Sequence, residues 1–453
     1  MVVNDPDVSD PSRKLETLLP DLISDLKHLT AIPSIAFPGY PPEMVVMAHD
    51  FVVGLLRDVG VEQIETIDLP DTSPILFAEV EGPPNSPTVL LYSHYDVQPP
   101  GDESLWTHKP FEPVEEDGVI YGRGVADDKS NLMAHIGAMR YFDGKPPVNL
   151  KIVFEGQEEF GSPFDYYPPK DPMRFACDAM VIADMGNIQP GVPTFTTALR
   201  GDAEVTVEVR TLPEPKHSGE YGGPAPDALI TLIHALSTLH DERGNPAVEG
   251  LLRDEWGGAQ PIDEARYRQM AGLGLDSPLL GEGTIADRLW AGPALTVVGL
   301  DAPPTEGAVL ALVPHAKALI NIRVHPRQKS REAQAAVVEH LRRIRPFGIE
   351  LIVEPAEAGD GFETTTDGPA YAAAREALRL AWGREPIEIG SGGAIPLVSG
   401  LQAAVPEAEV LLFGAEEMLC NLHAPNERLV IDEFRRTVIA MVEFFERLAA
   451  QHK

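Results

Sequence analysis

Cysteine and basic residues are both scarce in this sequence. It contains two cysteines, Cys177 and Cys420, which are too few for a disulfide framework and fit a reducing compartment. Lysine and arginine together number 36 against 70 aspartates and glutamates, and the formal net charge is -34. This charge argues against nucleic acid or an anionic membrane as a partner. Acidic and basic residues are interspersed, so the acidic excess indicates a solvated surface.

Long apolar runs are absent as well. No run approaches the length of a membrane span, and the first residues lack the basic region and the apolar stretch of a signal peptide. We therefore expect a cytoplasmic protein without a membrane partner. We find no internal repeat and no low-complexity tract. With 453 residues, 43% of them hydrophobic, the chain can bury a large core and is expected to form two domains.

One apolar segment, residues 88–96, ends in two polar residues. The run Val-Leu-Leu-Tyr follows prolines and precedes prolines, which is typical of a short strand covered on both faces. Its last residues include His94 and Asp96. Ligands bind beyond the carboxyl ends of the strands in open α/β sheets, so these two side chains stand where chemistry is expected. Taken alone, the pair would be interpreted as capping groups.

Acidic residues follow two later predicted strands in the same way. Glu158 and Glu159 come after the strand 149–155, and Asp184 comes directly after the strand 179–183. The repetition at several strand ends favours a shared site over isolated capping groups.

Two further segments bring candidate residues. His423 lies in a loop after the predicted strand 409–413, and Asp127 and Asp128 precede a helical pattern of apolar residues. An aspartate that merely caps the helix is the simpler interpretation of Asp128.

The order of predicted elements indicates an α/β protein with a mixed, mostly parallel sheet flanked by helices. Residues 203–210 instead alternate apolar and polar, which predicts an antiparallel sheet with one wet face. We therefore expect a smaller α+β domain inserted in the first, from which residues 241–289 make an excursion. The predicted boundaries are 1–199 and 358–453 for the two parts of the catalytic domain and 200–357 for the insertion. The predicted helices are 20–29, 43–59, 228–239, 331–343, 371–382 and 432–449, and the other predicted strands are 63–69, 75–80, 316–324 and 349–353.

Two imidazoles and three carboxylates at these strand ends are the nitrogen and oxygen ligands that zinc or manganese accepts. One catalytic zinc keeps only three protein ligands, so five ligands suit two metals that share a carboxylate and lie about 3.5 to 4 Å apart. Such a site needs a carboxylate free of metal as general base, and Glu158 beside Glu159 is the candidate. Asp96 is expected to orient His94 through its other ring nitrogen. The expected ligands are His94, Asp127, Glu159, Asp184 and His423.

In combination these residues resemble the di-metal peptidases that include carnosine and nonspecific dipeptidases, glutamate carboxypeptidases, aminoacylases, acetylornithine deacetylase and succinyl-diaminopimelate desuccinylase. The similarity covers most of the chain and is greatest to the dipeptidase subset. The family motifs His-x-Asp, Gly-Arg-Gly-x-x-Asp-Asp-Lys and Glu-Glu-x-Gly-Ser correspond to residues 94–96, 122–129 and 158–162, and its terminal Asp and His correspond to Asp184 and His423.

The resemblance implies a zinc-exopeptidase-like catalytic domain with two divalent ions per chain. Zinc is the expected metal, and manganese and cobalt are alternatives. One ion would be held by His94 and Asp184 and the other by Glu159 and His423, with Asp127 bridging. The resemblance also implies a cis peptide bond between Asp127 and the residue that follows it.

The inserted domain resembles the family's lid and dimerisation domain. His217, in Lys-His-Ser-Gly, matches a histidine that holds the carbonyl oxygen or the substrate carboxylate, and Arg323 matches a lid arginine. The loop 392–396 resembles Gly-Gly-Ser-Ile-Pro, but Ala394 replaces the serine, so main-chain N–H groups beside it, such as that of Gly393, are the expected carboxylate holders. In dimeric relatives the matching histidine reaches the neighbouring subunit's site, which implies a homodimer through this domain.

We therefore predict a metallopeptidase that hydrolyses the amide bond of dipeptides or small peptides, with Glu158 as general base and His217 stabilising the oxyanion. Two alternatives stand beside it. The same machinery could remove the acyl group of N-acyl amino acids, or the chain could be a catalytically silent metal-binding scaffold. A free Glu158 argues against the scaffold, which has no need of a base.

Overall fold

The computed structural model describes residues 11–393 and 395–452. Contacts between Cα atoms divide the chain into two compact units. The first holds the described residues up to Thr197 together with Thr364–Glu388 and those from Leu397 onward. The second holds Ala198–Glu363 and the described part of Ile389–Pro396. Residues 389–393, 395 and 396, which the predicted boundaries assign to the C-terminal part of the catalytic domain, group with the second unit.

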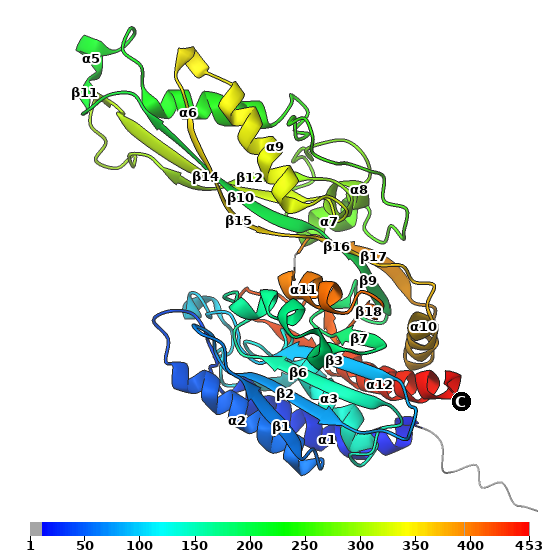
Figure 1. The fold of residues 1–453 in the computed structure, drawn as a ribbon. Helices are drawn as coiled ribbons and strands as arrows, with labels where there is room; N and C mark the ends of the chain where they lie inside the picture. The colour runs from blue at the N-terminus through cyan, green and yellow to red at the C-terminus, as the bar shows by residue number, and fades with distance from the viewer. Residues whose placement is uncertain (1–10, 394, 453) are drawn as a thin grey trace, which may run out of the picture. The chain divides into compact units, whose positions relative to one another are not determined.

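A six-stranded mixed sheet forms the centre of the first unit, in the order β1-β2-β6-β3-β7-β18 (Figure 1). The four strands β6, β3, β7 and β18 run parallel to one another. At one edge of the sheet β2 pairs antiparallel with β6, and β1 pairs antiparallel with β2. The predicted α/β class with a mostly parallel sheet is thus confirmed. The strands are β1 (Gln63–Ile67), β2 (Ile75–Val80), β3 (Thr88–His94), β6 (Asn149–Glu155), β7 (Ala179–Ile182) and β18 (Glu409–Leu412).

The central strand β3 is buried on both faces, as its continuous apolar run predicts. Val89 and Leu91 belong to the main core cluster of the unit. Leu90 and Tyr92, which point to the opposite face, are also fully buried. A strand covered on both sides has no polar positions until it ends, so the first polar side chains after the run appear at the carboxyl edge of the sheet.

Amphipathic helices supply the rest of this core. Figure 1 shows α12 and α3 running beside the sheet, and their apolar residues join those of the strands in one cluster. Helix α10 ends at Gly383, whose φ of 71° is a left-handed conformation that glycine adopts without penalty. The main helices of this unit are α1 (Pro11–Thr30), α2 (Pro42–Asp58), α3 (Lys129–Tyr141), α10 (Pro369–Trp382), α11 (Pro396–Ala404) and α12 (Ile431–Gln451).

Several short strands lie outside the large sheet. Three small sheets have the orders β20-β5-β4, β19-β8 and β16-β9-β17. Their strands are β4 (Val114–Glu116), β5 (Val119–Tyr121), β8 (Gly186–Asn187), β9 (Thr194–Leu199), β16 (Phe362–Glu363), β17 (Ile387–Ser391), β19 (Glu416–Glu417) and β20 (Arg428–Val430).

The second unit contains a four-stranded antiparallel sheet in the order β12-β14-β10-β15. Burial alternates along β10, so the predicted antiparallel strand with one wet face is confirmed. Helices α6 and α9 lie beside this sheet (Figure 1) and share a core cluster with its inward-facing residues. The elements are β10 (Gly201–Arg210), β12 (Ala294–Asp301), β14 (His315–Val324), β15 (Ile352–Gly359), α6 (Ala228–Leu236) and α9 (Ser330–Arg343).

Two smaller features complete the second unit. Strands β11 (Lys216–His217) and β13 (Ala311–Leu312) pair in a two-stranded ribbon. The short helix α5 (Ser218–Tyr221) follows β11 directly. The predicted excursion, residues 241–289, contains α7 (Glu264–Met270) and most of α8 (Ile285–Trp290).

Candidate metal centre

The carboxyl ends of the parallel strands carry the predicted site residues. His94 is the last residue of β3, and Asp184 follows β7 by two positions. Glu158 and Glu159 lie in the turn after β6. Because these strands run parallel and are neighbours, their ends meet at one edge of the sheet. The expectation that residues scattered over the sequence share one place is met by the geometry.

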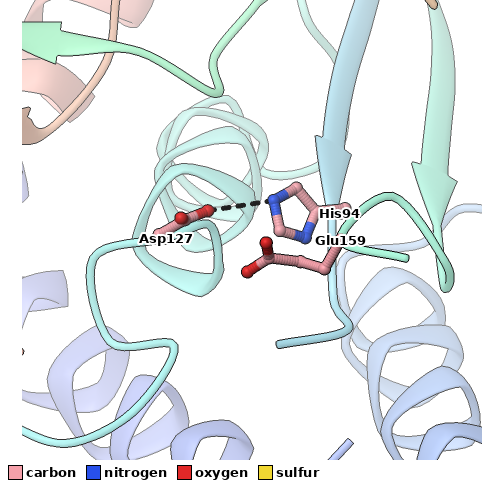
Figure 2. Close-up of side chains that lie close together, drawn as sticks. All are labelled: His94, Asp127 and Glu159. Carbon is pink, nitrogen blue, oxygen red and sulfur yellow. Dashed lines mark hydrogen bonds and ion pairs between the residues drawn. The ribbon is translucent and has the colours of Figure 1, made fainter. Parts of the chain in front are cut away.

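Asp127 lies between the two histidines. Its Oδ1 is 3.0 Å from Nε2 of His94, and its Oδ2 is 3.0 Å from Nε2 of His423. Nε2 of His423 is also 3.1 Å from Oε2 of Glu159. Figure 2 shows Asp127, His94 and Glu159 pointing into the same space. Each oxygen of one carboxylate thus faces a different imidazole, which is the arrangement that a bridging ligand needs. The peptide bond between Asp127 and the next residue is cis, as the resemblance implied.

Asp184 and Glu158 also lie close to His94. Oδ1 of Asp184 is 3.9 Å from Nε2 of His94. His94, Glu158 and Asp184 offer ligand atoms that all lie within 4.8 Å of one another, as do His94, Asp127 and Glu159. The edge of the sheet therefore presents overlapping sets of possible ligands, and His94 belongs to both of these.

Asp96 connects two segments of this edge. Its carboxylate accepts hydrogen bonds from the main-chain N–H groups of Glu158 at 3.0 Å and Glu159 at 3.2 Å. Nδ1 of His94 lies 3.1 Å from the main-chain oxygen of Asp96 and 3.4 Å from its Oδ1. Asp96 is fully buried. It therefore fixes the turn that carries both glutamates and lies against the second ring nitrogen of His94.

Asp128 does not cap the helix that follows it, so the simpler interpretation of this residue is wrong. As the residue before α3 it accepts no capping hydrogen bond from a main-chain N–H of the first turn. Its carboxylate instead accepts hydrogen bonds from the main-chain N–H of His94 at 3.0 Å and from Nδ2 of Asn131 at 2.7 Å. A main-chain N–H of β3 thus replaces the helix N–H that a capping aspartate would bind. The spacing of residues in the sequence does not reveal this partner.

Glu427 supports the segment before Asp127 and was not predicted. Its carboxylate accepts hydrogen bonds from the N–H groups of Gly124, Ala126 and Asp127 at 2.9, 3.0 and 3.2 Å. Nη1 of Arg123 donates to it at 2.7 Å. Its only signal in the sequence is that it is an acid four positions after His423.

Gln98 and Glu416 were missed as well. Gln98 donates its main-chain N–H and its Nε2 to the carboxylate of Glu159, at 3.1 and 2.8 Å. Glu416 offers an oxygen within 4.8 Å of ligand atoms of Asp127 and Asp184. Glu416 is buried. Its place in the sequence shortly after β18 is the signal that could have identified it.

The electrostatics of this edge call for positive charge. Burial raises the pKa of Glu158, Asp184 and Glu416 well above its ordinary value, and neighbouring carboxylates raise it further. For Asp127 burial acts in the same direction, but hydrogen bonds from His423 and His94 outweigh it and lower the pKa. These buried acids cannot all ionise together unless cations lie among them. Two imidazoles and several carboxylates are also nitrogen and oxygen donors suited to divalent metals, so the residues present fit a metal centre.

The remaining predicted residues lie in the second unit. His217 is exposed at the end of β11, and its Nδ1 accepts a hydrogen bond from the N–H of Gly219 at 3.1 Å. Arg323 lies on β14, with Nη1 3.3 Å from Oδ1 of Asp202. The N–H of Gly393 donates to Oγ of Ser391 at 3.2 Å, so this donor already has a partner. Ala394 lies outside the described residues.

Comparison with known proteins decides the family. The model of peptidase family M20/M25/M40 matches residues 90–447. The chain belongs to this family. It is therefore a peptidase-type hydrolase of the metallopeptidase class, as the resemblance implied. Within the family it is 36% identical over 407 residues to cysteinylglycine-S-conjugate dipeptidase of Corynebacterium striatum, covering 88% of this chain and 89% of that protein.

This M20-family chain is also similar to human dipeptidases. It is 27% identical over 466 residues to human Beta-Ala-His dipeptidase, covering 95% of this chain and 91% of that protein. The crystal structure of human carnosine dipeptidase 1 superposes with a TM-score of 0.82 at 25% identity, over 97% of this chain and 98% of that one. Among residues 11–393 and 395–452, no helix has the length and apolar character needed to cross a membrane.

Proposed function

We propose that this enzyme hydrolyses dipeptides with two divalent metal ions and Glu158 as general base. The observation that carries the proposal is Asp127, whose two carboxylate oxygens each lie 3.0 Å from a different histidine beside an acid-rich sheet edge. The dipeptidases of Corynebacterium striatum and human to which the chain is similar support a dipeptide as substrate.

His94 and Asp184 would hold one ion and Glu159 and His423 the other, with Asp127 shared between them. Zinc suits this mixture of imidazole and carboxylate ligands, and manganese and cobalt are the alternatives. When bound, such ions polarise the scissile carbonyl and lower the pKa of a coordinated water.

Glu158 would move the proton in this reaction. Burial raises the pKa of its carboxyl group above the ordinary value, which brings it towards the range in which a general base works near neutral pH. Glu158 accepts a proton as the water oxygen bonds to the carbonyl carbon. It then delivers that proton to the nitrogen of the leaving amine as the C–N bond breaks. Asp96 fixes the main chain of Glu158 during both transfers.

His217 would stabilise the oxyanion. Its Nδ1 accepts a hydrogen bond from the N–H of Gly219, so in the neutral ring the proton lies on Nε2. Nε2 is then a hydrogen-bond donor on an exposed side chain, as a group that reaches towards developing negative charge must be. Arg323, about a third exposed beside Asp202, would hold the substrate carboxylate. Gly393 and Ala394 belong to the same proposed subsite, and the N–H of Gly393 would have to exchange its present partner, Ser391.

A homodimer formed through the second unit, which would serve as lid and dimerisation domain, is part of the proposal. Strand β12 is an edge strand of its sheet and exposes Val297, Val298 and Leu300. Helix α6 exposes Ile230 and Ile233. Apolar side chains on an unpaired edge are a hazard for a monomer and a natural surface for a self-complementary two-fold interface. The proposed location is the cytoplasm, in accord with the reduced thiols of the two free cysteines.

A substrate panel tests the proposed activity. Purified enzyme is loaded separately with zinc, manganese and cobalt and assayed on dipeptides, longer peptides and N-acyl amino acids. Cys-Gly, its S-alkylated derivatives and β-Ala-His belong in the panel because the relatives suggest them. Preference for short peptides with a free α-amino group supports a dipeptidase. Preference for a blocked amino group would replace this function with N-acyl-amino-acid deacylation.

A further inference from the structure

Arg200, just before β10, is a buried cation with almost no hydrogen-bond partners. The residue is 8% exposed. Nη1 makes one long contact, 3.5 Å, with the main-chain oxygen of Gly292, and Nε has no partner in the part of the chain that the structure describes. A guanidinium group carries five N–H donors, so most of its capacity is unused.

The charges around Arg200 do not compensate its positive charge. Burial and the nearby guanidinium of Arg323 lower the pKa of Arg200 to about 10, which leaves it charged at neutral pH. No ion pair of Arg200 with a carboxylate is found among residues 11–393 and 395–452. A buried charge without a counter-ion is strongly unfavourable, and buried charges are usually paired. An anion bound from outside the chain would supply the missing partner.

A glycine lies beside the guanidinium group of Arg200. The loop 391–393 lies directly against the guanidinium, and a Cβ added at Gly392 would come within 2.9 Å of its Nη2. The main-chain N–H of Arg200 is hydrogen-bonded to the oxygen of Ser391 at 3.2 Å, which fixes the loop to this position. Glycine at position 392 thus keeps one side of the arginine clear of side chains.

Arg200 also lines a hollow of about 400 Å³ within the second unit. The excursion and the start of β12 form its walls, which are mostly aliphatic. The aliphatic lining residues are Leu273, Leu279, Leu280, Ile285, Leu289 and Ala294. An anion at Arg200 would therefore have an apolar space beside it, large enough for a chain of several carbons.

We propose that Arg200 and this hollow form a binding site for an organic carboxylate, with the carboxylate on the guanidinium and an apolar body among the aliphatic side chains. Two sources share this chemistry. One is the C-terminal residue of a peptide substrate, in which case the inference rests on the proposed function and Arg200 would hold the substrate carboxylate together with the nearby Arg323. The other is a free carboxylate with an alkyl chain, in which case the site stands apart from catalysis.

Calorimetric titration of the metal-loaded enzyme with acetate, butanoate, hexanoate and octanoate tests the site without any need for hydrolysis. Affinity should rise about fourfold for each methylene that enters the hollow. Arg200→Gln should weaken octanoate binding roughly tenfold or more, because a charge-assisted hydrogen bond is lost. Leu279→Trp should weaken octanoate much more than acetate. The matched control is Arg210→Gln at the far end of β10, where the arginine is 68% exposed, and it should bind octanoate like the wild type.

Thermal unfolding distinguishes this role from a structural one. Arg200→Met should raise the melting temperature of the ligand-free enzyme, because it removes a buried unpaired charge, and should abolish the stabilisation by octanoate. A purely structural arginine would give the opposite result in the ligand-free state.

Kinetics then separate the two sources. If octanoate competes with a dipeptide and Arg200→Gln raises KM for that dipeptide with little change in kcat, the substrate supplies the carboxylate. If octanoate binds without competing and KM is unchanged in Arg200→Gln, the ligand is a free carboxylate. Equal octanoate affinity in the wild type and in Arg200→Gln, or a lower melting temperature for Arg200→Met, overturns the site. Failure of the dipeptidase proposal would leave these binding and melting results unaffected.

Discussion

Oδ2 of Asp127 lies 3.0 Å from Nε2 of His423, a residue 296 positions further along the chain. The contact joins the segment before α3 to the loop after β19, and the other oxygen of the same carboxylate faces His94. One side chain thus holds together the two halves of the candidate metal centre, which makes its removal the most direct test of a bridged pair.

Asp127→Ala should therefore disturb both metals. The wild-type enzyme should contain up to two divalent ions per chain and lose activity when a chelator removes them. The variant should lose most of both ions, because neither half keeps its full set of ligands. Elemental analysis after dialysis measures this. One tightly held ion in a fully active wild-type enzyme would contradict the bridged pair.

Glu158 and Glu159 are adjacent but should respond differently to substitution. Glu158→Ala should keep both ions and lose turnover by roughly two to four orders of magnitude, the usual range for a general base. Glu159→Ala should lose affinity for one ion, because its carboxylate lies 3.1 Å from Nε2 of His423.

The comparison of metal content with kcat in the same samples decides between these roles. Addition of excess metal should restore activity to Glu159→Ala in part and leave Glu158→Ala unchanged. Near-normal turnover of Glu158→Ala would assign the general base to another residue.

Glu427 should be important for stability although it binds no expected metal. It is fully buried, pairs with buried Arg123 at 2.7 Å, and accepts three main-chain N–H groups. Glu427→Ala leaves the cation and these donors without a partner, so we expect a loss of roughly 3–5 kcal/mol in the free energy of unfolding. Urea denaturation measures it. Glu112→Ala, which removes a surface partner of Lys109, should have no measurable effect.

These residues show what the sequence could and could not predict. His94, Asp96, Asp184 and the Glu158–Glu159 turn follow apolar runs, and the carboxyl ends of parallel strands must meet, so local patterns suffice to gather them. Glu427 and Asp128 act on main-chain groups from distant segments. Such contacts depend on which distant segments the fold brings together, and local sequence patterns do not show this.

The same limit applies to some of the secondary structure. No strand was predicted at β12, and its burial pattern explains why: as an edge strand it exposes most of its middle residues and does not alternate. The strand predicted at 349–353 lies at 352–359, beyond a 3₁₀ turn. Strands that are buried on both faces or that alternate, such as β3 and β10, were predicted closely.

His135 should make stability depend on pH. The residue is fully buried on α3, stacks on Phe154, and has no partner for Nδ1 in the described chain. Burial lowers the pKa of His135 to about 4. In the unfolded chain the imidazole has a pKa near 6.5, so between these two pH values it binds a proton that the native state does not bind. The free energy of unfolding therefore falls as the pH falls from about 6.5 to about 4.

Replacement with a neutral ring isolates this contribution. The wild type should lose roughly 2 kcal/mol more than His135→Phe when the pH is lowered from 7.5 to 5. Urea denaturation at both pH values gives the difference. His234→Phe, at an exposed position on α6, is the matched control and should follow the wild type. Parallel curves for the wild type and His135→Phe would show that His135 takes up its proton in the native state as well.

The proposed homodimer predicts that two inactive variants restore each other. His217 lies on β11 in the second unit, whereas Glu158 lies at the edge of the sheet of the first unit. If the histidine serves the site of the partner subunit, His217→Ala and Glu158→Ala should each be nearly inactive as pure proteins. In a heterodimer, one site combines the intact His217 of one chain with the intact Glu158 of the other, and the second site lacks both.

Mixing equal amounts under conditions of subunit exchange gives half of the dimers as heterodimers, each with one complete site. Activity should therefore recover towards about a quarter of the wild-type value. The control is the same mixture before exchange, which should remain inactive, and mass spectrometry of differently tagged chains should verify that heterodimers form. If they form and activity stays absent, His217 acts within its own chain or takes no part in catalysis. A fully active monomer at the assay concentration would remove the shared site, because a monomer has no partner chain to supply His217.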